Sequence, residues 1–358
     1  MPNSAVLIGT NNHPRGEGIY RCQLDLDTGE LRDLDLVARV ENPSFLVLTH
    51  NERNLYCVSE HKKDGEHTGG SVHAFSVSQG SAELSPISHR STEGTCPVHL
   101  SVDREEKGLY VANYASGSVI SYPLNSDGSI GAKASFFQLE GSSIHPKRQK
   151  QAHAHSIYID PQSKKAYACD LGSDKVWIYD CDPSTARLSP SKPDHKASKA
   201  GSGPRHMAFH EGGKRLFVLN ELSSNISVFD FSGLKNQLNL KQTISTLPDT
   251  FKDHSTCAEI VVSRDGKYIY ASNRGHDSIA VFLWNEGAEK LELAGRAPTN
   301  GQHPRNFVID STEQYLLAAN LRSDNVVSFF IDPDDGTLEP TGFSIEVPNP
   351  ICVRCLSQ

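Results

Sequence analysis

The sequence predicts an all-β protein, a seven-bladed β-propeller with four antiparallel strands in each blade. A strand-opening motif recurs seven times along the chain, with starts at residues 43, 97, 153, 204, 257, 304 and 350. A period of about fifty residues is typical of repeats that stack around an axis or along a line. Each repeat contains short runs rich in Val, Ile, Tyr and Phe, separated by Gly, Asp, Asn and Ser, which is the pattern of strands and turns. No run of ten or more residues shows helical periodicity.

The repeat around residue 100 illustrates the predicted elements. Residues 98–102 form a first strand, 109–113 a second, 118–122 a third and 129–134 a weaker fourth. The second and third strands recur at 165–170 and 176–179, 216–220 and 226–229, 268–273 and 279–282, and 315–320 and 326–330. Four short strands in each repeat indicate propeller blades.

The two ends of the chain complete the ring. Residues 5–10 match a second strand and 19–24 a third, but no first strand precedes them, whereas 349–355 match a first strand with nothing after it. We therefore predict a single propeller over residues 1–358 whose last blade combines about 4–35 with about 349–356. Closure of this kind leaves no exposed sheet edge.

Three linkers are longer than a turn. Residues 61–70 and 189–203 are polar and rich in turn-forming residues, so we expect surface loops. Residues 141–151 carry Lys147, Arg148 and Lys150. This segment is either a solvated loop or a basic rim that steers an anionic ligand.

Composition narrows the class of partner. The 358 residues carry a formal net charge of −8, which argues against nucleic acid or an anionic membrane as the main partner. The eight cysteines are scattered, and even the pair Cys352 and Cys355 lies within a strand-like run, so we expect free thiols in a reducing compartment. No apolar stretch approaches the roughly 18 residues of a membrane span. We expect a cytoplasmic monomer or weak dimer that acts on a small molecule.

Propeller geometry gathers many polar residues at one place. The first strand of a blade lines the central channel and the second runs antiparallel to it, so the start of one and the end of the other meet at one channel mouth. The polar and charged residues expected there are His99, His153, His155, Arg205, His206, Glu221, Glu259, Arg274, His276 and Arg305. So many polar groups around one axis require a ligand or water to satisfy them.

The residue types at the mouth indicate an anionic ligand. Arg205, Arg274 and Arg305 offer planar guanidinium groups that match phosphate or carboxylate. Glu221 or His155 is suited to act as the general base for a water molecule. Glu221 has a second interpretation, compatible with the first, in which a salt bridge to Arg205 or Arg274 merely positions it.

A metal ion is not expected at this mouth, because the same arginines would repel a cation. The pair His153 and His155 keeps the question open, since histidines are common metal ligands. We find no nucleophile elbow, phosphate-binding loop or dinucleotide-binding fingerprint, and we expect no cofactor.

Several segments carry a resemblance to a known family. They are Gly-Pro-Arg-His-Met-Ala-Phe-His at 203–210, Val-Leu-Asn-Glu-Leu-Ser-Ser at 218–224, His-Ser-Ile at 155–157, Ala-Ser-Asn-Arg at 271–274 and Gln-His-Pro-Arg-Asn-Phe-Val-Ile-Asp at 302–310. With them, the whole chain resembles the lactonase family of seven-bladed propellers. That family includes the propeller-type 6-phosphogluconolactonase of bacteria and the fungal 3-carboxy-cis,cis-muconate lactonizing enzyme.

The resemblance implies metal-independent lactone chemistry at the channel mouth. It assigns the catalysis to His155, Arg205, Glu221 and Arg274, with Arg305 and His206 nearby. The extra histidines His153 and His276, and His99 on a neighbouring first strand, complete the predicted substrate-binding set. The segments 61–70 and 141–151 depart from the family pattern and could reshape the mouth.

Three functions follow from these observations. The leading hypothesis is hydrolysis of a sugar-phosphate lactone, 6-phosphogluconolactone, to 6-phosphogluconate. The second is reversible closure of a carboxylated muconate by a cycloisomerase that uses the same arginines. The third is a non-catalytic propeller that serves as a scaffold or ligand sensor.

Overall fold

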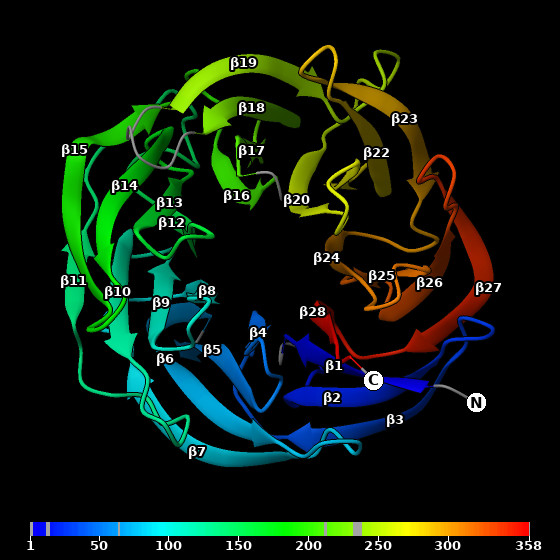
Figure 1. Cartoon of the computed structure of the whole chain (residues 1–358), viewed down its shortest axis with the longest axis horizontal. Helices are drawn as coiled ribbons and strands as arrows, with labels where there is room; N and C mark the ends of the chain where they lie inside the picture. Colours follow the sequence, from blue (N-terminus) through cyan, green and yellow to red (C-terminus); the bar gives the residue numbers. More distant parts are fainter. Residues whose placement is uncertain (1–2, 12–14, 64, 211–212, 232–237, 358) are drawn as a thin grey trace.

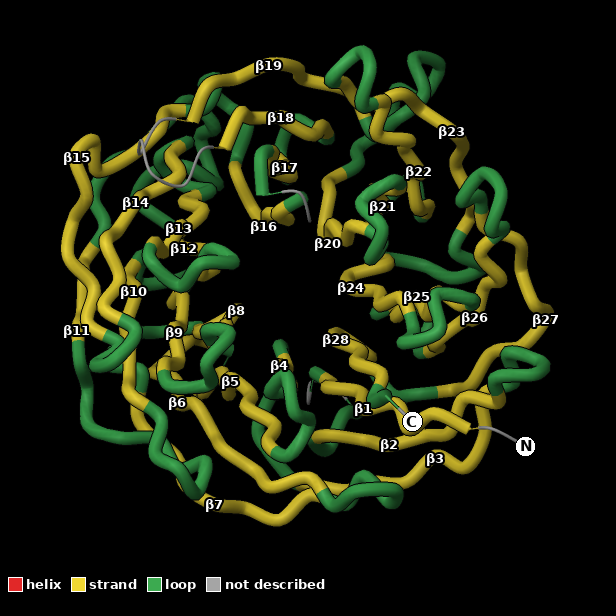
Figure 2. Tube along the Cα trace, viewed as in Figure 1, coloured by secondary structure: helices red, strands yellow, loops and turns green. Residues whose placement is uncertain are grey.

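The computed structural model describes residues 3–11, 15–63, 65–210, 213–231 and 238–357. Within them, seven four-stranded antiparallel sheets are arranged around one axis, as Figure 1 shows. The predicted propeller is confirmed, and the trace in Figure 2 contains strands and loops but no helix in the part of the chain that is described. No described segment therefore qualifies as a membrane-spanning helix.

Each sheet has one strand near the axis and one at the rim. From the axis outwards, the sheets are β28-β1-β2-β3, β4-β5-β6-β7, β8-β9-β10-β11, β12-β13-β14-β15, β16-β17-β18-β19, β20-β21-β22-β23 and β24-β25-β26-β27. The innermost strands are β4 (Leu46–Leu48), β8 (Pro97–Val102), β12 (Ala154–Ile159), β16 (Pro204–Phe209), β20 (Thr256–Val262), β24 (Pro304–Ile309) and β28 (Pro350–Cys355). The second strands are β1 (Asn3–Thr10), β5 (Asn54–Lys63), β9 (Gly108–Asn113), β13 (Lys165–Asp170), β17 (Arg215–Asn220), β21 (Tyr268–Arg274) and β25 (Tyr315–Asn320). The third strands are β2 (Ile19–Asp25), β6 (Glu66–Val77), β10 (Ser118–Pro123), β14 (Lys175–Asp182), β18 (Asn225–Phe231), β22 (Ser278–Asn285) and β26 (Asn325–Ile331). The rim strands are β3 (Leu31–Ala38), β7 (Leu84–Ser91), β11 (Ser135–Gln138), β15 (Arg187–Ala197), β19 (Leu238–Ser245), β23 (Lys290–Pro298) and β27 (Leu338–Glu346).

The hydrophobic core lies between neighbouring blades. Phe217 and Val228 of one blade pack with Ile269 and Phe282 of the next, and all four are fully buried. Because second strands such as β17 and β21 are covered on both faces, they carry continuous apolar runs rather than an alternating pattern.

The blade shared by the two termini is confirmed. Strand β1 pairs antiparallel with β2 on one side and with β28 on the other, so that Ile8 lies opposite Val353. Arg354 also donates from Nε to the carbonyl of Leu46 in the next blade at 2.9 Å. Strand β28 therefore completes the sheet that begins with β1, and its Arg354 connects this sheet to the blade that contains Leu46.

Two of the predicted loops are wrong. Residues 61–70 continue a hairpin, because β5 and β6 remain paired as far as Lys63 with Glu66; residue 64 lies outside the described residues. Most of 189–203 belongs to rim strand β15. Strands pair through their backbones, so a strand that faces solvent does not need a regular pattern of apolar side chains. Because both segments are polar, their composition did not predict these strands.

The fourth strand predicted at 129–134 is also wrong. Residues 124 and 130 form an isolated bridge around a turn, and the rim strand β11 begins only at Ser135. The free cysteines expected from the sequence are present as unpaired thiols, and most of them are buried.

We predict that a chain ending at residue 349 loses cooperative folding. Removal of β28 exposes the edge of β1 and deletes the buried Ile351, Cys352 and Val353. Burial of one such side chain stabilises a protein by about 1.5–3 kcal/mol, and an open sheet edge promotes aggregation.

Thermal unfolding followed by circular dichroism, together with size-exclusion chromatography, measures this effect. A chain ending at residue 356 is the control and should unfold like the intact protein. A monomeric, cooperatively folded chain ending at residue 349 would contradict the prediction.

Candidate functional site

A pocket of about 410 Å³ lies at the predicted channel mouth. Most of its lining residues lie at the ends of second strands or the starts of first strands. They are Asn11, Glu60, Lys62, His67, Cys96, Val98, Tyr114, Arg148, His155, Glu221, Arg274, Arg305, Leu321 and Ile351. The expected convergence of strand ends at one mouth is confirmed.

The centre of the pocket is a buried carboxylate held by three arginines. Glu221 directly follows β17 and is 2% exposed. Its Oε1 accepts from Arg148 Nη2 at 2.7 Å, and its Oε2 accepts from Arg205 Nε at 3.0 Å and lies 2.9 Å from Arg274 Nη2. We call Glu221, Arg148, Arg205 and Arg274 the carboxylate cluster.

The charges of the cluster determine the protonation of Glu221. Burial acts to raise the pKa of this carboxyl, but Arg274, Arg205 and Arg148 outweigh burial and hold the pKa well below its ordinary range. Glu221 is therefore a permanent carboxylate and a weak base. This favours its positioning role over a role as general base.

Arg205 and His206 lie beneath the pocket rather than on its wall. Gly203 precedes the Pro204-Arg205 start of β16 with a φ of 65°, and a Cβ at Gly203 would lie 2.6 Å from Leu222 Cγ, so only glycine fits this turn. The turn directs Arg205 behind Glu221, where its Nη1 also donates to the Ala258 carbonyl. Burial and the charge of Arg274 lower the pKa of Arg205 to about 9.

His206 links Arg205 to a second buried carboxylate. Its Nε2 lies 3.1 Å from Arg205 Nη1 and its Nδ1 lies 2.7 Å from Glu259 Oε1. Burial is the main reason that the pKa of His206 falls to about 4, so the ring is neutral, accepts from Arg205 and donates to Glu259. Glu259 also accepts from Asn306, whose Oδ1 in turn accepts from Arg354 Nη1 at 3.1 Å.

His155 lines the pocket beside the carboxylate cluster. Its Nε2 lies 3.8 Å from Glu221 Oε2, and its Nδ1 is buried without a hydrogen-bond partner among the described residues. Burial, followed by the charge of Arg205, lowers the pKa of His155 well below its ordinary value. A neutral imidazole with an unpaired ring nitrogen is thus present in the pocket.

Arg305 is the arginine of this pocket that remains unpaired. Within the part of the chain that the structure describes, no hydrogen bond or ion pair engages its guanidinium group. Arg274 likewise keeps a buried Nε without a partner there, although its Nη2 donates to the Cys257 carbonyl at 2.6 Å. Unpaired guanidinium donors next to a pocket are suited to an anionic ligand.

Two segments supply residues that the sequence did not assign to the site. Arg148 comes from the segment 141–151, where it also donates to the hydroxyl of Tyr114 at 3.1 Å, in agreement with the basic-rim interpretation. Lys62 and His67 come from the extended β5–β6 hairpin. The basic composition of 141–151 had indicated that Arg148 could lie at the rim of the mouth. Lys62 and His67 could not be predicted, because the segment 61–70 was expected to be a surface loop.

Three predicted substrate-binding histidines do not line the pocket. His99 lies deeper, packed on Phe45 and Tyr158 with ring centroids 4.3 and 4.5 Å away. His153 stacks on the ring of Tyr114, and His276 Nδ1 lies 2.7 Å from Ser278 Oγ. The structure thus brings His155, Glu221, Arg274 and Arg305 to the pocket, with Arg205 and His206 directly beneath.

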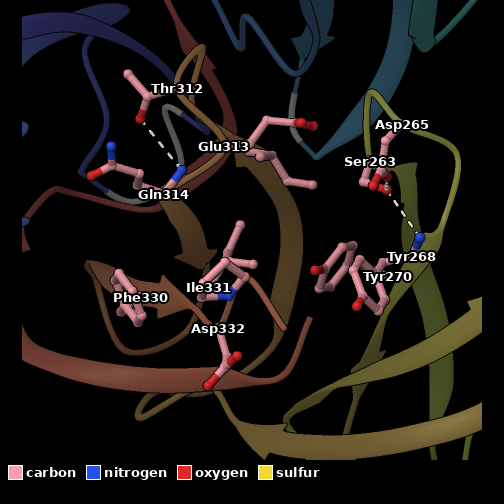
Figure 3. Close-up of a pocket in the computed structure, with 12 residues that line it drawn as sticks. Ser263, Asp265, Tyr268, Tyr270, Thr312, Glu313, Gln314, Phe330, Ile331 and Asp332 are labelled. Carbon is pink, nitrogen blue, oxygen red and sulfur yellow. Dashed lines mark hydrogen bonds between the residues drawn. The ribbon is translucent and has the colours of Figure 1, made fainter. Parts of the chain in front are cut away.

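A larger hollow of about 520 Å³ lies elsewhere, between the β20–β23 and β24–β27 blades (Figure 3). Its lining includes Asp265, Glu313 and Asp332 and contains no basic residue. The hydroxyls of Tyr268 and Tyr270 are already bonded to the carbonyls of Asp334 and Gly336. An acidic surface with satisfied hydroxyls does not suit an anionic ligand, so the channel mouth remains the candidate site.

Comparison with known proteins identifies the family. The sequence model of the family described as Lactonase, 7-bladed beta-propeller, matches residues 5–355. The chain belongs to this lactonase family. It is 35% identical over 351 residues to a 6-phosphogluconolactonase of Bacillus subtilis, with 98% of each chain covered.

Two further proteins are similar to this chain over most of their length. A 6-phosphogluconolactonase of Formosa agariphila is 35% identical over 328 residues, which cover 90% of this chain and 91% of that protein. The crystallised periplasmic gluconolactonase of Pseudomonas aeruginosa superposes with a TM-score of 0.94 at 30% identity over 99% of both chains.

We predict that His206 makes the stability of the protein depend on pH below about 6.5. The unfolded chain takes up a proton at this histidine near pH 6.5, whereas folded His206 has a pKa of about 4, so acidification favours unfolding and the effect vanishes above pH 6.5. Between these values His206 contributes up to about 1.4 kcal/mol per pH unit.

Urea unfolding of the wild type and of His206→Asn between pH 5 and 7.5 measures this contribution. The variant lacks the titrating ring, so its free energy of unfolding should fall less steeply below pH 6.5. Equal slopes for the two proteins would contradict the prediction.

Proposed function

We propose that the protein hydrolyses a sugar-phosphate lactone, 6-phosphoglucono-1,5-lactone, to 6-phosphogluconate in the channel-mouth pocket. The observation that carries this proposal is that a neutral His155, the pocket-lining residues of the carboxylate cluster and the unpaired Arg305 meet in one pocket. Two relatives named 6-phosphogluconolactonase and a structure named as a gluconolactonase support a sugar lactone as the substrate class.

The proposed chemistry begins with a water molecule held by His155. The neutral imidazole of His155, which lines the pocket, takes a proton from water as the water oxygen attacks the lactone carbonyl carbon. Collapse of the tetrahedral intermediate breaks the bond to the ring oxygen, which receives the proton from His155 and becomes a hydroxyl group. The product carboxyl group then loses its proton to solvent.

The arginines stabilise the charge that develops on the carbonyl oxygen. Arg274 lines the pocket beside His155, so its guanidinium group is suited to stabilise the oxyanion. Glu221 keeps Arg274 in place and offsets part of its charge. Because the low pKa of His155 follows partly from nearby arginines, an anionic substrate would raise its basicity as it binds.

The phosphate group would be held by Arg305 and Lys62. Both residues line the pocket, and Arg305 has no competing partner in the described chain. No step of this mechanism uses a metal ion, so the proposed lactonase is metal-independent.

We predict that His155→Gln and Glu221→Gln each lower kcat/KM by about a hundredfold or more. The first removes the proposed base and the second releases the arginines that Glu221 positions; general-base catalysis alone contributes about 10²–10⁴-fold. The measurement is a pH-stat assay with freshly prepared 6-phosphogluconolactone in the presence of EDTA.

Circular dichroism verifies that both variants are folded. Wild-type rates in either folded variant, or loss of wild-type activity in EDTA, would contradict the mechanism. Activity on a carboxylated muconate alone would favour the cycloisomerase, and no activity on either substrate would favour the scaffold.

We predict that Arg305→Met selectively impairs the phosphorylated substrate. Loss of a charge-assisted hydrogen bond costs about 1.5–3 kcal/mol, or roughly 10–150-fold in kcat/KM for 6-phosphogluconolactone. Unphosphorylated gluconolactone should be affected much less. Arg322→Met, at an exposed arginine of the neighbouring strand connection, is the matched control; equal effects of Arg305→Met on both lactones would contradict a phosphate contact.

A further inference from the structure

A second cluster of side chains lies on the pocket wall, apart from the carboxylate cluster. It consists of Glu60 on β5, His67 on β6 and Cys96 directly before β8. One ligand atom from each residue lies within 4.8 Å of the other two. The proposed hydrolysis uses none of these three side chains.

Two residues of this second cluster are buried, and the third has a buried ring nitrogen without a hydrogen-bond partner in the described chain. Glu60 is 6% exposed and Cys96 is 5% exposed. His67 Nδ1 is also buried and has no hydrogen-bond partner among the described residues. A buried ring nitrogen without a partner destabilises the fold, and a ligand on that nitrogen would offset this cost.

Two of the three separations are close to those of ligand atoms around one small cation. Cys96 Sγ lies 3.5 Å from Glu60 Oε2, and His67 Nδ1 lies 4.0 Å from the same oxygen. Tetrahedral zinc with bonds of about 2.0–2.3 Å places neighbouring ligand atoms roughly 3.3–3.5 Å apart. The sulfur–oxygen distance already matches, and the nitrogen–oxygen distance needs a shift of about half an ångström to match the same geometry.

The backbone holds the cluster in this arrangement. Cys96 has a φ of 56°, an uncommon conformation for a residue with a side chain. The extended hairpin places Glu60 opposite Gly70, and Lys62 opposite His67. Residues 61–70, which we expected to form a loop, are part of this hairpin, and the hairpin brings His67 back towards Glu60.

The types of ligand atom indicate the metal. A thiolate, an imidazole and a carboxylate are the ligands of zinc, whereas calcium and magnesium require oxygen ligands. We propose that Glu60 Oε2, His67 Nδ1 and Cys96 Sγ bind a Zn²⁺ ion whose fourth position is open to the pocket. On binding, Cys96 releases its thiol proton to solvent and its sulfur becomes a ligand of the ion.

Two cations near the cluster limit its affinity. Lys62 Nζ lies 3.9 Å from Glu60 Oε2, and Arg305 lines the same pocket. The negative charges of Glu60 and the Cys96 thiolate together neutralise a Zn²⁺ ion. The positive charges of Lys62 and Arg305 then remain, so the net charge around the ion is positive. The open fourth position therefore favours water or an anion.

Metal titration of the full-length protein tests this site independently of lactonase activity. After treatment with a chelator and its removal, isothermal titration with Zn²⁺ should reveal a site of about one ion per chain that weakens by roughly a hundredfold in Cys96→Ser and in His67→Gln. Cobalt(II) in place of zinc should give a near-ultraviolet thiolate-to-cobalt absorption band that Cys96→Ser abolishes. Cys181→Ser, at a half-buried thiol bonded to Tyr110, is the matched control and should retain both signals.

The variant Lys62→Met tests the same site by a change that should strengthen Zn²⁺ binding. Removal of the competing ammonium group should strengthen Zn²⁺ binding by about two- to fivefold, the range of a partly exposed ion pair. Wild-type binding no tighter than that of folded Cys96→Ser or His67→Gln would overturn the proposal. A cobalt complex without the thiolate band would do the same.

Discussion

The burial of Glu221 among three arginines is the interaction on which the candidate site depends. A lone carboxylate with 2% exposure would be strongly destabilised, and removal of one partner from a buried ion cluster leaves uncompensated charge. The partners come from three separate places: Arg148 from the segment 141–151, Arg205 from β16 and Arg274 from β21. The cluster therefore forms only when the neighbouring blades are fixed in position relative to one another.

Ring closure supplies that constraint. In the blade formed by β28 and β1–β3, β28 covers the inner edge of β1, and Arg354 links this blade to the next through the carbonyl of Leu46. Arg354 also bonds Asn306, which connects to Glu259, His206 and Arg205 beneath the pocket. The strand that closes the propeller is thus linked by buried hydrogen bonds to the arginine that holds Glu221.

The pocket combines two groups of residues with different chemistry. In the first group, Glu221 and its arginines place charge beside the neutral imidazole of His155. The second group consists of Arg305, residues of the β5–β6 hairpin and Cys96, which line the same pocket. Lactone chemistry at the first group and recognition of an anionic group by the second would explain why a single propeller mouth holds both.

The sequence by itself determined the number of blades, the closure of the ring and the strand ends that meet at the mouth. It did so because the apolar runs of the strands near the axis repeat at a regular spacing of about fifty residues. The same repeat assigned His155, Glu221, Arg274 and Arg305 to one opening. Rim strands such as β15 escaped prediction, since solvent on one face removes the apolar signal. Only the tertiary structure decided which charges pair and that Lys62 and His67 reach the pocket, because such contacts depend on ångström-scale separations between side chains of different blades.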